Sequence, residues 1–185
     1  MNHRTQPNTR NRKPILILVV LFLAPLGAAF WLYYGSSWRP SLHTNHGVLI
    51  TPPVLLPKLA SGKWTLLVVG QGESGCDAGC RGTLVYARQT WLSLAQLTPR
   101  VQRVLLAGPG CCDRDYLQRE HNGLIILNTA GTEAAPLLQR VPDPREGTIF
   151  VVDPLGNLMM RYDVRQDPKG LREDLKKLLE LSHIG

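Results

Sequence analysis

Two pairs of cysteines are the residues of this sequence whose type and spacing best suit chemistry. The first pair, Cys76 and Cys80, has C-x-x-x-C spacing, and the second consists of the adjacent Cys111 and Cys112. Thiolates attack disulfides, and they are also the ligands that soft metal ions such as Cu(I) prefer. The cysteines therefore predict thiol–disulfide exchange or Cu(I) binding.

The C-x-x-x-C pair lies where a predicted strand gives way to a predicted helix. The start of a helix stabilises a thiolate through the helix dipole and its unpaired N–H groups. Within a helix the α-carbons of Cys76 and Cys80 would be about 6.2 Å apart, near the upper limit for a disulfide. We expect a bridge between them to be strained and reversible, and the same two thiolates to suit Cu(I). The alternative is a static structural disulfide, which is usual for paired cysteines in exported proteins.

The second cysteine pair follows the sequence Gly108-Pro109-Gly110 at the end of another predicted strand. Adjacent α-carbons are about 3.8 Å apart, which is too close for easy bridging between Cys111 and Cys112. We expect them to stay as thiols, to pair elsewhere or to bind metal. Because neighbouring parallel strands end at one edge of a sheet, this pair could lie near Cys76 and Cys80. It would then serve as resolving cysteines or auxiliary metal ligands; the alternative is an incidental loop pair.

Hydrophobic periodicity predicts the elements that position these cysteines. Short apolar runs predict five strands, and a period of about 3.6 residues predicts three helices. The predicted strands are 64–69, 101–107, 124–127, 148–152 and 158–162, the last two forming a hairpin, and the predicted helices are 76–97, 113–121 and 168–182. This alternation indicates an α/β fold in which helices flank a mixed central sheet.

An apolar segment near the amino terminus predicts a single transmembrane helix. Residues 15–34 carry no charged side chain, and twenty helical residues span about 30 Å, the thickness of a bilayer's hydrocarbon core. The basic flank over 1–14 predicts that this end stays in the cytoplasm and that the rest of the chain is exported. A cleaved signal peptide is the alternative, although its apolar core is usually shorter. We expect a retained anchor, a stalk over 35–46 and a folded domain over 47–185.

The formal net charge of +7 does not predict a nucleic-acid-binding domain. Residues 1–72 contain seven Lys and Arg and no Asp or Glu, whereas residues 73–185 contain fourteen charges of each sign. The basic excess therefore belongs to the membrane flank and the stalk. The segment Gly70–Gly75 matches the letters of a dinucleotide fingerprint, but the acidic residue expected about twenty positions later is missing. We expect neither nucleic acid nor a nucleotide as a partner.

The sequence resembles the SCO/SenC family. The resemblance rests on the amino-terminal anchor, the exported α/β pattern, the C-x-x-x-C after the first strand and a late Val-Asp-Pro-x-Gly-Asn hairpin, and it covers about residues 47–182. Members of that family are membrane-anchored thioredoxin-fold proteins that deliver copper and maintain thiols in cytochrome c oxidase assembly. The resemblance implies a thioredoxin-like fold here, with Cys76 and Cys80 as the redox and copper-binding cysteines.

The sequence departs from that family at the third copper ligand, which is a histidine. Counting back without a gap from Gly156 puts this ligand near Arg145, and no histidine lies between His121 and His183. His121 falls in the last turn of a predicted helix, where a positive charge interacts favourably with the dipole. The third ligand is therefore unassigned, and its loss shifts the expected function from copper carriage toward thiol–disulfide exchange.

The resemblance implies an inner-membrane protein whose domain faces the periplasm and whose partner is a respiratory oxidase subunit or another assembly factor. In the redox version Cys76 attacks a partner disulfide and Cys80 resolves the mixed disulfide. In the metal version both thiolates hold Cu(I). The protein is then either a thiol–disulfide oxidoreductase or a metallochaperone. Two further alternatives are an anchored, non-catalytic scaffold with a structural disulfide and a peroxiredoxin-like thiol peroxidase.

Overall fold

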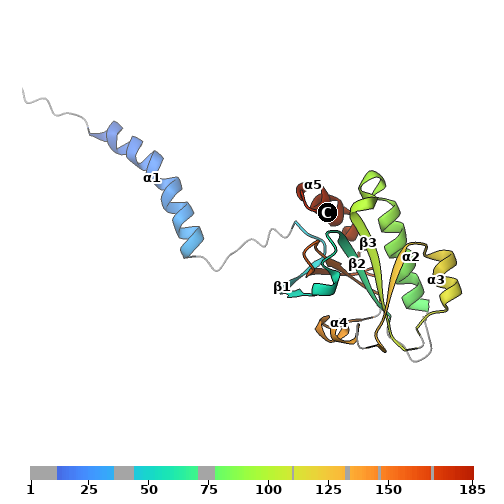
Figure 1. Ribbon diagram of the computed structural model, residues 1–185. Coiled ribbons are helices and arrows are strands. Elements are labelled where there is room, and N and C mark those ends of the chain that lie inside the picture. Colours follow the sequence, from blue (N-terminus) through green and yellow to red (C-terminus); the bar gives the residue numbers. More distant parts are fainter. Residues whose placement is uncertain are drawn as a thin grey trace, which may run out of the picture. The chain divides into compact units, whose positions relative to one another are not determined.

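The computed structural model contains two compact units, which divide between His43 and Thr44. The first unit contains a single described helix, and the second contains an α/β domain (Figure 1). The described residues are 12–35, 44–70, 78–109, 111–131, 134–145, 147–167 and 169–185.

Helix α1 (Lys13–Tyr34) has the length and composition of a membrane-spanning segment. Its 22 residues rise about 33 Å, close to the thickness of the hydrocarbon core of a bilayer. None of its residues is buried. The helix is therefore long and apolar enough to cross a membrane, a property that signal sequences near an amino terminus share.

A six-stranded mixed sheet forms the centre of the second unit, with the strand order β1-β6-β5-β2-β3-β4. Strands β2, β3 and β4 pair in parallel, whereas β5, β6 and β1 join the sheet antiparallel to their neighbours. Strand β2 is buried along its whole length, as expected of a continuous apolar run at the centre of a sheet. The strands are β1 (Val48–Leu55), β2 (Trp64–Gly70), β3 (Val101–Ala107), β4 (Leu124–Asn128), β5 (Thr148–Val152) and β6 (Asn157–Asp163).

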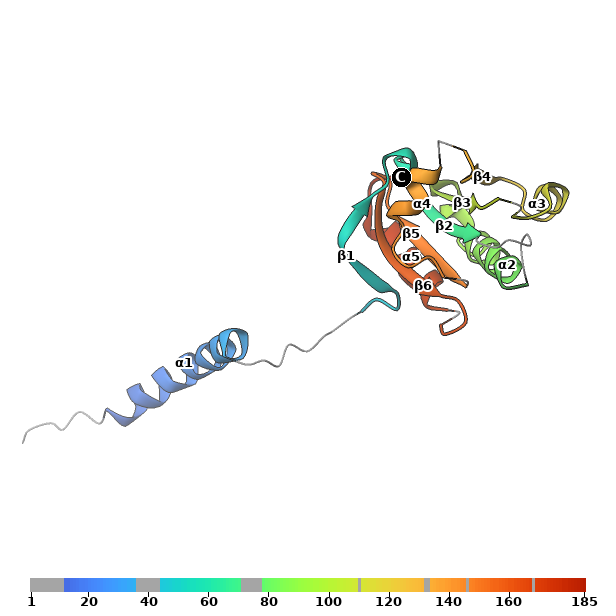
Figure 2. The same cartoon turned by 90° about the horizontal axis from the view of Figure 1, so that it is seen from below.

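Helices cover both faces of this sheet (Figure 2). They are α2 (Ala78–Leu92), α3 (Arg114–Glu120), α4 (Ala135–Arg140) and α5 (Gly170–Leu181), with short 3-10 helices at η1 (Pro57–Leu59) and η2 (Ala95–Arg100). Helices α2, α3 and α5 bury Leu84, Leu117 and Leu175 against one face. Helix α4 and η1 bury Leu137 and Leu59 against the other. The predicted α/β fold with a flanked, mixed central sheet is confirmed.

The carboxyl-terminal end of the predicted helix 76–97 differs from the prediction. Helix α2 ends at Leu92, and a separate 3-10 helix follows it. Ala95 has a φ of 50°, and a residue in this left-handed region ends a right-handed helix. The apolar period of about 3.6 residues continues past this point although the helix does not, so it predicted the end of the helix too late in the chain.

Strand β1 and helix α4 are absent from the sequence-based prediction. The ladder between β1 and β6 is interrupted between Leu49 and Val54, and this stretch contains Pro52 and Pro53. Proline has no N–H to donate to a ladder, so it is restricted to edge strands and marks a sequence as a loop. Helix α4 has six residues, which is too short for a helical period to stand out.

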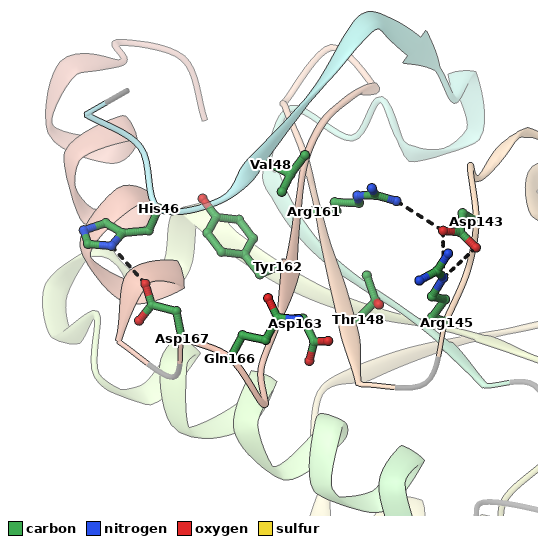
Figure 3. Close-up of a pocket in the computed structure, with 10 residues that line it drawn as sticks. All are labelled: His46, Val48, Asp143, Arg145, Thr148, Arg161, Tyr162, Asp163, Gln166 and Asp167. Carbon is green, nitrogen blue, oxygen red and sulfur yellow. Dashed lines mark hydrogen bonds and ion pairs between the residues drawn. The ribbon is translucent and has the colours of Figure 1, made fainter. Parts of the chain in front are cut away.

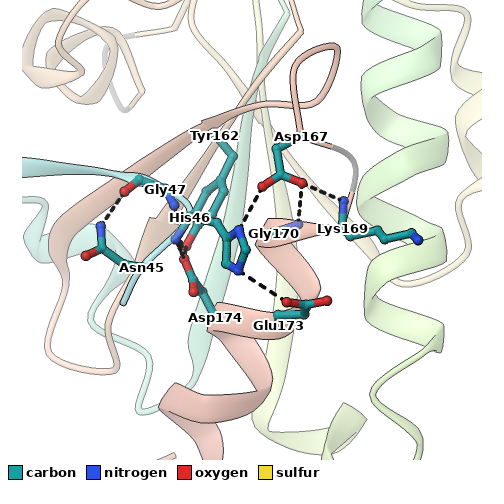
Figure 4. Close-up of polar contacts among 9 residues, drawn as sticks. All are labelled: Asn45, His46, Gly47, Tyr162, Asp167, Lys169, Gly170, Glu173 and Asp174. Atoms are coloured by element: carbon teal, nitrogen blue, oxygen red, sulfur yellow. Dashed lines mark hydrogen bonds and ion pairs between the residues drawn. The ribbon is translucent and has the colours of Figure 1, made fainter. Parts of the chain in front are cut away.

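A buried carboxylate fastens the start of the domain to helix α5 (Figure 4). Asp174 is 5% exposed, and its Oδ2 accepts hydrogen bonds from the backbone N–H groups of His46 at 2.7 Å and Gly47 at 3.0 Å. The Tyr162 hydroxyl donates a third hydrogen bond to the same oxygen at 2.9 Å. Burial, followed by the contact with Asp174, raises the pKa of Tyr162 far above its ordinary value, so this hydroxyl keeps its proton. The end of the predicted stalk is therefore fixed to the domain.

His121 caps helix α3, but it is not the charged residue that the sequence predicts. Its side chain is 2% exposed, and Nε2 lies 3.3 Å from the Tyr116 hydroxyl. Burial lowers the pKa of His121, and the positive charges of Arg103 and Arg88 lower it further. The imidazole is therefore neutral at pH 7 and adds no charge to the helix dipole, so that prediction was wrong.

We expect the domain to lose stability as the pH falls below about 6.5, the ordinary pKa of histidine. Because folding lowers the pKa of His121, the unfolded chain binds the proton first, and protonation favours unfolding. One such group changes the free energy of unfolding by at most about 1.4 kcal/mol per pH unit. Denaturant unfolding at about pH 7.5 and 5.5 measures the effect. His121→Phe has no titrating ring and should flatten the dependence; identical dependences in the two proteins would contradict the prediction.

Candidate functional site

The described cysteines gather at the edge of the sheet where β2 and β3 end. Gly70 and Ala107 are the last residues of these strands, and they pair in register. The Gly108 N–H donates to the Gly70 carbonyl at 2.9 Å, and the Cys111 N–H donates to the Gly108 carbonyl at 3.0 Å. The chain after β3 therefore turns back over the end of β2. Cys80, in the first turn of α2, reaches the same edge because α2 follows β2.

Three sulfur atoms come together at this edge. The Sγ atoms of Cys80, Cys111 and Cys112, here called the sulfur cluster, all lie within 4.8 Å of one another. Those of Cys111 and Cys112 are 3.1 Å apart. Cys80 is 6% exposed, and the other two side chains are half-buried. Within the described ranges of the chain, no other group of three or more Cys, His, Asp or Glu side chains has ligand atoms spaced to hold a metal ion.

Two features of the backbone allow the three sulfur atoms to lie close to one another. Cys112 has a φ of 64°, a left-handed conformation that is uncommon for residues other than glycine. In an extended chain adjacent side chains point to opposite sides, so the turn at Cys112 lets both sulfurs face one side. Gly70 provides the space, because a Cβ at this position would overlap the Cys111 sulfur and would lie 3.6 Å from the Cys80 sulfur.

Cys112 belongs to a disulfide. Its 3.1 Å separation from the Cys111 sulfur is longer than an S–S bond, which is about 2.05 Å. Neither Cys80 nor Cys111 supplies the second sulfur. Cys76, the first member of the predicted C-x-x-x-C pair, lies outside the described residues.

The position at which the SCO/SenC resemblance places a histidine holds an ion pair instead. Arg145 Nε lies 2.8 Å from an Asp143 carboxylate oxygen, and Arg161 Nη1 lies 3.5 Å from the same oxygen. The hydrogen bond from Arg145 holds the pKa of Asp143 below its ordinary value. These residues line a pocket of about 190 Å³ together with Thr148 and Asp163, among others (Figure 3). Arginine nitrogens stay protonated and do not bind metal cations, so this position offers no third ligand.

The described histidines do not join the sulfur cluster. His46 Nδ1 lies 2.9 Å from an Asp167 oxygen and Nε2 lies 3.2 Å from a Glu173 oxygen, so both ring nitrogens face carboxylates. His121 is buried beside Tyr116. Among the described residues, the third Cys, His, Asp or Glu atom that lies close to the Cys80 and Cys111 sulfurs is therefore the Cys112 sulfur rather than an imidazole nitrogen.

The fold agrees with a comparison against known families. The family model described as "Transmembrane-like, thioredoxin-like, C-terminal domain" matches residues 64–182. The chain belongs to this family. The matched segment of this thioredoxin-like protein runs from β2 through α5 and includes all three residues of the sulfur cluster. A search of curated proteins finds no match.

Solved structures resemble this thioredoxin-like protein in fold. Arabidopsis thaliana ScoI with copper bound aligns with a TM-score of 0.54 and 16% identity, over 74% of this chain and 99% of that chain. A putative thioredoxin from Neisseria meningitidis aligns with a TM-score of 0.51 and 15% identity, over 71% of this chain and 91% of that chain. At such identities the likeness shows the fold alone. The thioredoxin-like fold implied by the SCO/SenC resemblance is thereby confirmed.

Proposed function

We propose that this chain is a membrane-anchored, thioredoxin-like protein that exchanges thiols and disulfides and handles Cu(I) for an exported partner. The partner we propose is a respiratory oxidase subunit or another factor of oxidase assembly. The observation that carries the proposal is the sulfur cluster at the strand edge, because α/β proteins place their reactive groups where parallel strands end. The fold shared with copper-bound ScoI supports a divergent SCO/SenC protein in which Arg145 replaces the histidine.

We propose that α1 is retained as the membrane anchor, with a cytoplasmic flank over 1–14, a span over 15–34 and a stalk over 35–46. The basic residues Arg12 and Lys13 directly before the span support a cytoplasmic amino terminus. The domain from residue 47 would then face the periplasm, at the inner membrane. An oxidising compartment of this kind allows a disulfide such as that of Cys112 to persist.

The proposed exchange begins when the Cys76 thiolate attacks a partner disulfide. A mixed disulfide forms and one partner thiolate leaves. The Cys80 thiolate then attacks the Cys76 sulfur, which releases the second partner thiolate and leaves a disulfide in this protein. The chain has four cysteines, and the Cys112 disulfide includes neither Cys80 nor Cys111. We therefore propose Cys76 as its second sulfur, which makes Cys112 a second candidate for the resolving role.

The reduction potential of the full-length protein in detergent micelles tests this proposal. The protein is equilibrated in glutathione buffers of graded potential, its thiols are alkylated, and each cysteine is quantified by peptide mass spectrometry. We expect a potential above about −300 mV, because exchange-competent disulfides are more oxidising than structural ones. A value below this limit would favour the non-catalytic scaffold instead.

Trapping of the mixed disulfide distinguishes the two candidates for the resolving cysteine. Reduced Cys80→Ser and Cys112→Ser proteins are treated with oxidised glutathione, and the glutathione bound at Cys76 is measured by mass. The variant without the resolving cysteine should accumulate this adduct, because nothing displaces the glutathione. Cys76→Ser is the control that removes the attacking thiol. An absence of the adduct at Cys76 in the double variant Cys80→Ser/Cys112→Ser, which lacks both candidates, would exclude the exchange mechanism.

A further inference from the structure

We propose that Cys80, Cys111 and Cys112 form a three-sulfur Cu(I) site that becomes able to bind the ion when a dithiol reduces the Cys112 disulfide. The site itself stands on the geometry of three described residues. The choice of Cu(I) as the bound ion rests on the proposed function. This site differs from one made by the C-x-x-x-C pair, because two of its three ligands come from the segment after β3.

The distances within the sulfur cluster suit a single metal ion. Thiolate sulfurs bind such ions at about 2.3 Å, so two sulfurs on one ion can be at most about 4.6 Å apart, and about 4 Å apart in a trigonal site. The three Sγ atoms all lie within 4.8 Å of one another, and the Cys111 and Cys112 sulfurs are 3.1 Å apart. Adjustments of about 1 Å, within the reach of cysteine rotamers, bring all three onto one ion.

The backbone already holds the ligands in the required arrangement. The left-handed φ of Cys112 sets its sulfur beside that of Cys111, so two adjacent residues can chelate from one side. Cys80 is carried separately by α2, in the connection between β2 and β3. Because a helix and a strand end bring in the three ligands, the site forms without reorganisation of the fold, which lowers the entropic cost of binding.

The chemistry of the ligand set selects the ion. Three thiolates without an imidazole or carboxylate favour thiophilic ions such as Cu(I) and Zn²⁺ over hard ions, and among these Cu(I) is the one that the proposed function supplies. Three thiolates and one Cu(I) leave an excess of negative charge, and the amino-terminal end of the 15-residue helix α2 offsets part of it. Cys80 is buried, whereas Cys111 and Cys112 are half-buried. The ion would therefore be shielded on one side and remain accessible to a partner's thiolates on the other.

The disulfide of Cys112 makes the site dependent on redox state. In the disulfide, the Cys112 sulfur is bonded to another sulfur and is not a thiolate ligand. A dithiol reductant supplies two electrons and two protons to the disulfide, two thiols form, and the reductant becomes a disulfide. Cu(I) then displaces the thiol protons as it binds. Reduction thus increases the number of sulfur ligands in the cluster from two to three.

Copper titration of the full-length protein in detergent tests the site. Dithiol-reduced and oxidised samples are titrated anaerobically with Cu(I) against a chromophoric Cu(I) chelator. We expect one ion per reduced chain and an affinity at least tenfold lower for the oxidised protein. Cys111→Ser should lower the affinity of the reduced protein at least tenfold, whereas a site made by the C-x-x-x-C pair alone would leave it unchanged. Equal affinity of the oxidised and reduced proteins, or of Cys111→Ser and the parent, would overturn the proposal.

X-ray absorption at the copper edge provides a test that needs no variant and therefore no assumption about folding. Three sulfur scatterers in the reduced wild-type protein support the site, and two overturn it. The matched control for the titration is Gly82→Ala, a change on the exposed side of α2 where an added Cβ has nothing within 4 Å. The reduction potential is measured without copper, so a failure of this site and a failure of thiol exchange are distinguishable.

Discussion

Gly70→Ala is expected to disperse the sulfur cluster and to lower the Cu(I) affinity of the reduced protein at least tenfold, since loss of even an outer-shell partner of a metal site costs about 10–100-fold. The new Cβ would overlap the Cys111 sulfur, lie 3.3 Å from Leu105 Cδ1 and lie 3.6 Å from the Cys80 sulfur. The Cys111 side chain must rotate away, because β2 is buried along its length and has no room to shift. Overpacking of this kind also costs about 1–3 kcal/mol of stability. Chelator-competition titration and denaturant unfolding measure the two effects.

Gly82→Ala separates this effect from a general response to a glycine substitution. Gly82 lies two residues after Cys80 in α2, is exposed, and has nothing within 4 Å of an added Cβ. Alanine is a better helix former than glycine, so this variant should gain about 0.5–1 kcal/mol of stability and keep its copper affinity. If both variants bind Cu(I) as tightly as the parent, Gly70 is not the residue that makes space for the cluster.

The meeting of Cys111 and Cys112 with Cys80 follows from the sequence, but the state of the sulfurs does not. Apolar runs located the strands β2 and β3, and parallel strands end at one edge, so the sequence predicts that cysteines after both strands could lie near one another. The left-handed turn at Cys112 is a conformation of one residue, and no periodicity reports it. Four cysteines allow three disulfide connectivities, which sequence alone does not distinguish. The C-x-x-x-C spacing predicts a disulfide between Cys76 and Cys80, whereas in the structure Cys112 belongs to a disulfide.

The attachment of the domain's first residues was missed for a different reason. Asp174 lies between the apolar positions Leu171 and Leu175 of α5, on the buried side of the helix. An acidic residue at such a position signals a buried carboxylate with partners, but its partners here are backbone N–H groups of His46 and Gly47. Backbone donors carry no sequence signature. The strand that follows them contains two prolines, so a stalk was the natural interpretation of this segment.

Asp174→Ala is expected to destabilise the domain by about 3–5 kcal/mol, because three donors lose a charged acceptor and hydrogen bonds to charged groups contribute about 1.5–3 kcal/mol each. The carboxylate is 5% exposed and accepts hydrogen bonds from His46, Gly47 and the Tyr162 hydroxyl. Alanine leaves these donors without their acceptor, and each buried unsatisfied group costs about 1–3 kcal/mol. Against a total stability of about 5–15 kcal/mol, this is a large fraction. Urea unfolding of the full-length protein in detergent, followed by near-UV circular dichroism, measures the loss.

The neighbouring acid provides the matched control. Glu173 lies one residue earlier in α5 and reaches His46 Nε2 at 3.2 Å, but its side chain is 59% exposed. An exposed ion pair of this kind contributes at most about 1 kcal/mol, because water screens it and ordering the side chains costs entropy. Glu173→Ala should therefore change stability by less than Asp174→Ala, although both remove one carboxylate that contacts the same histidine. Equal losses would mean that the negative charge near His46, rather than the buried hydrogen bonds of Asp174, holds the first strand to the domain.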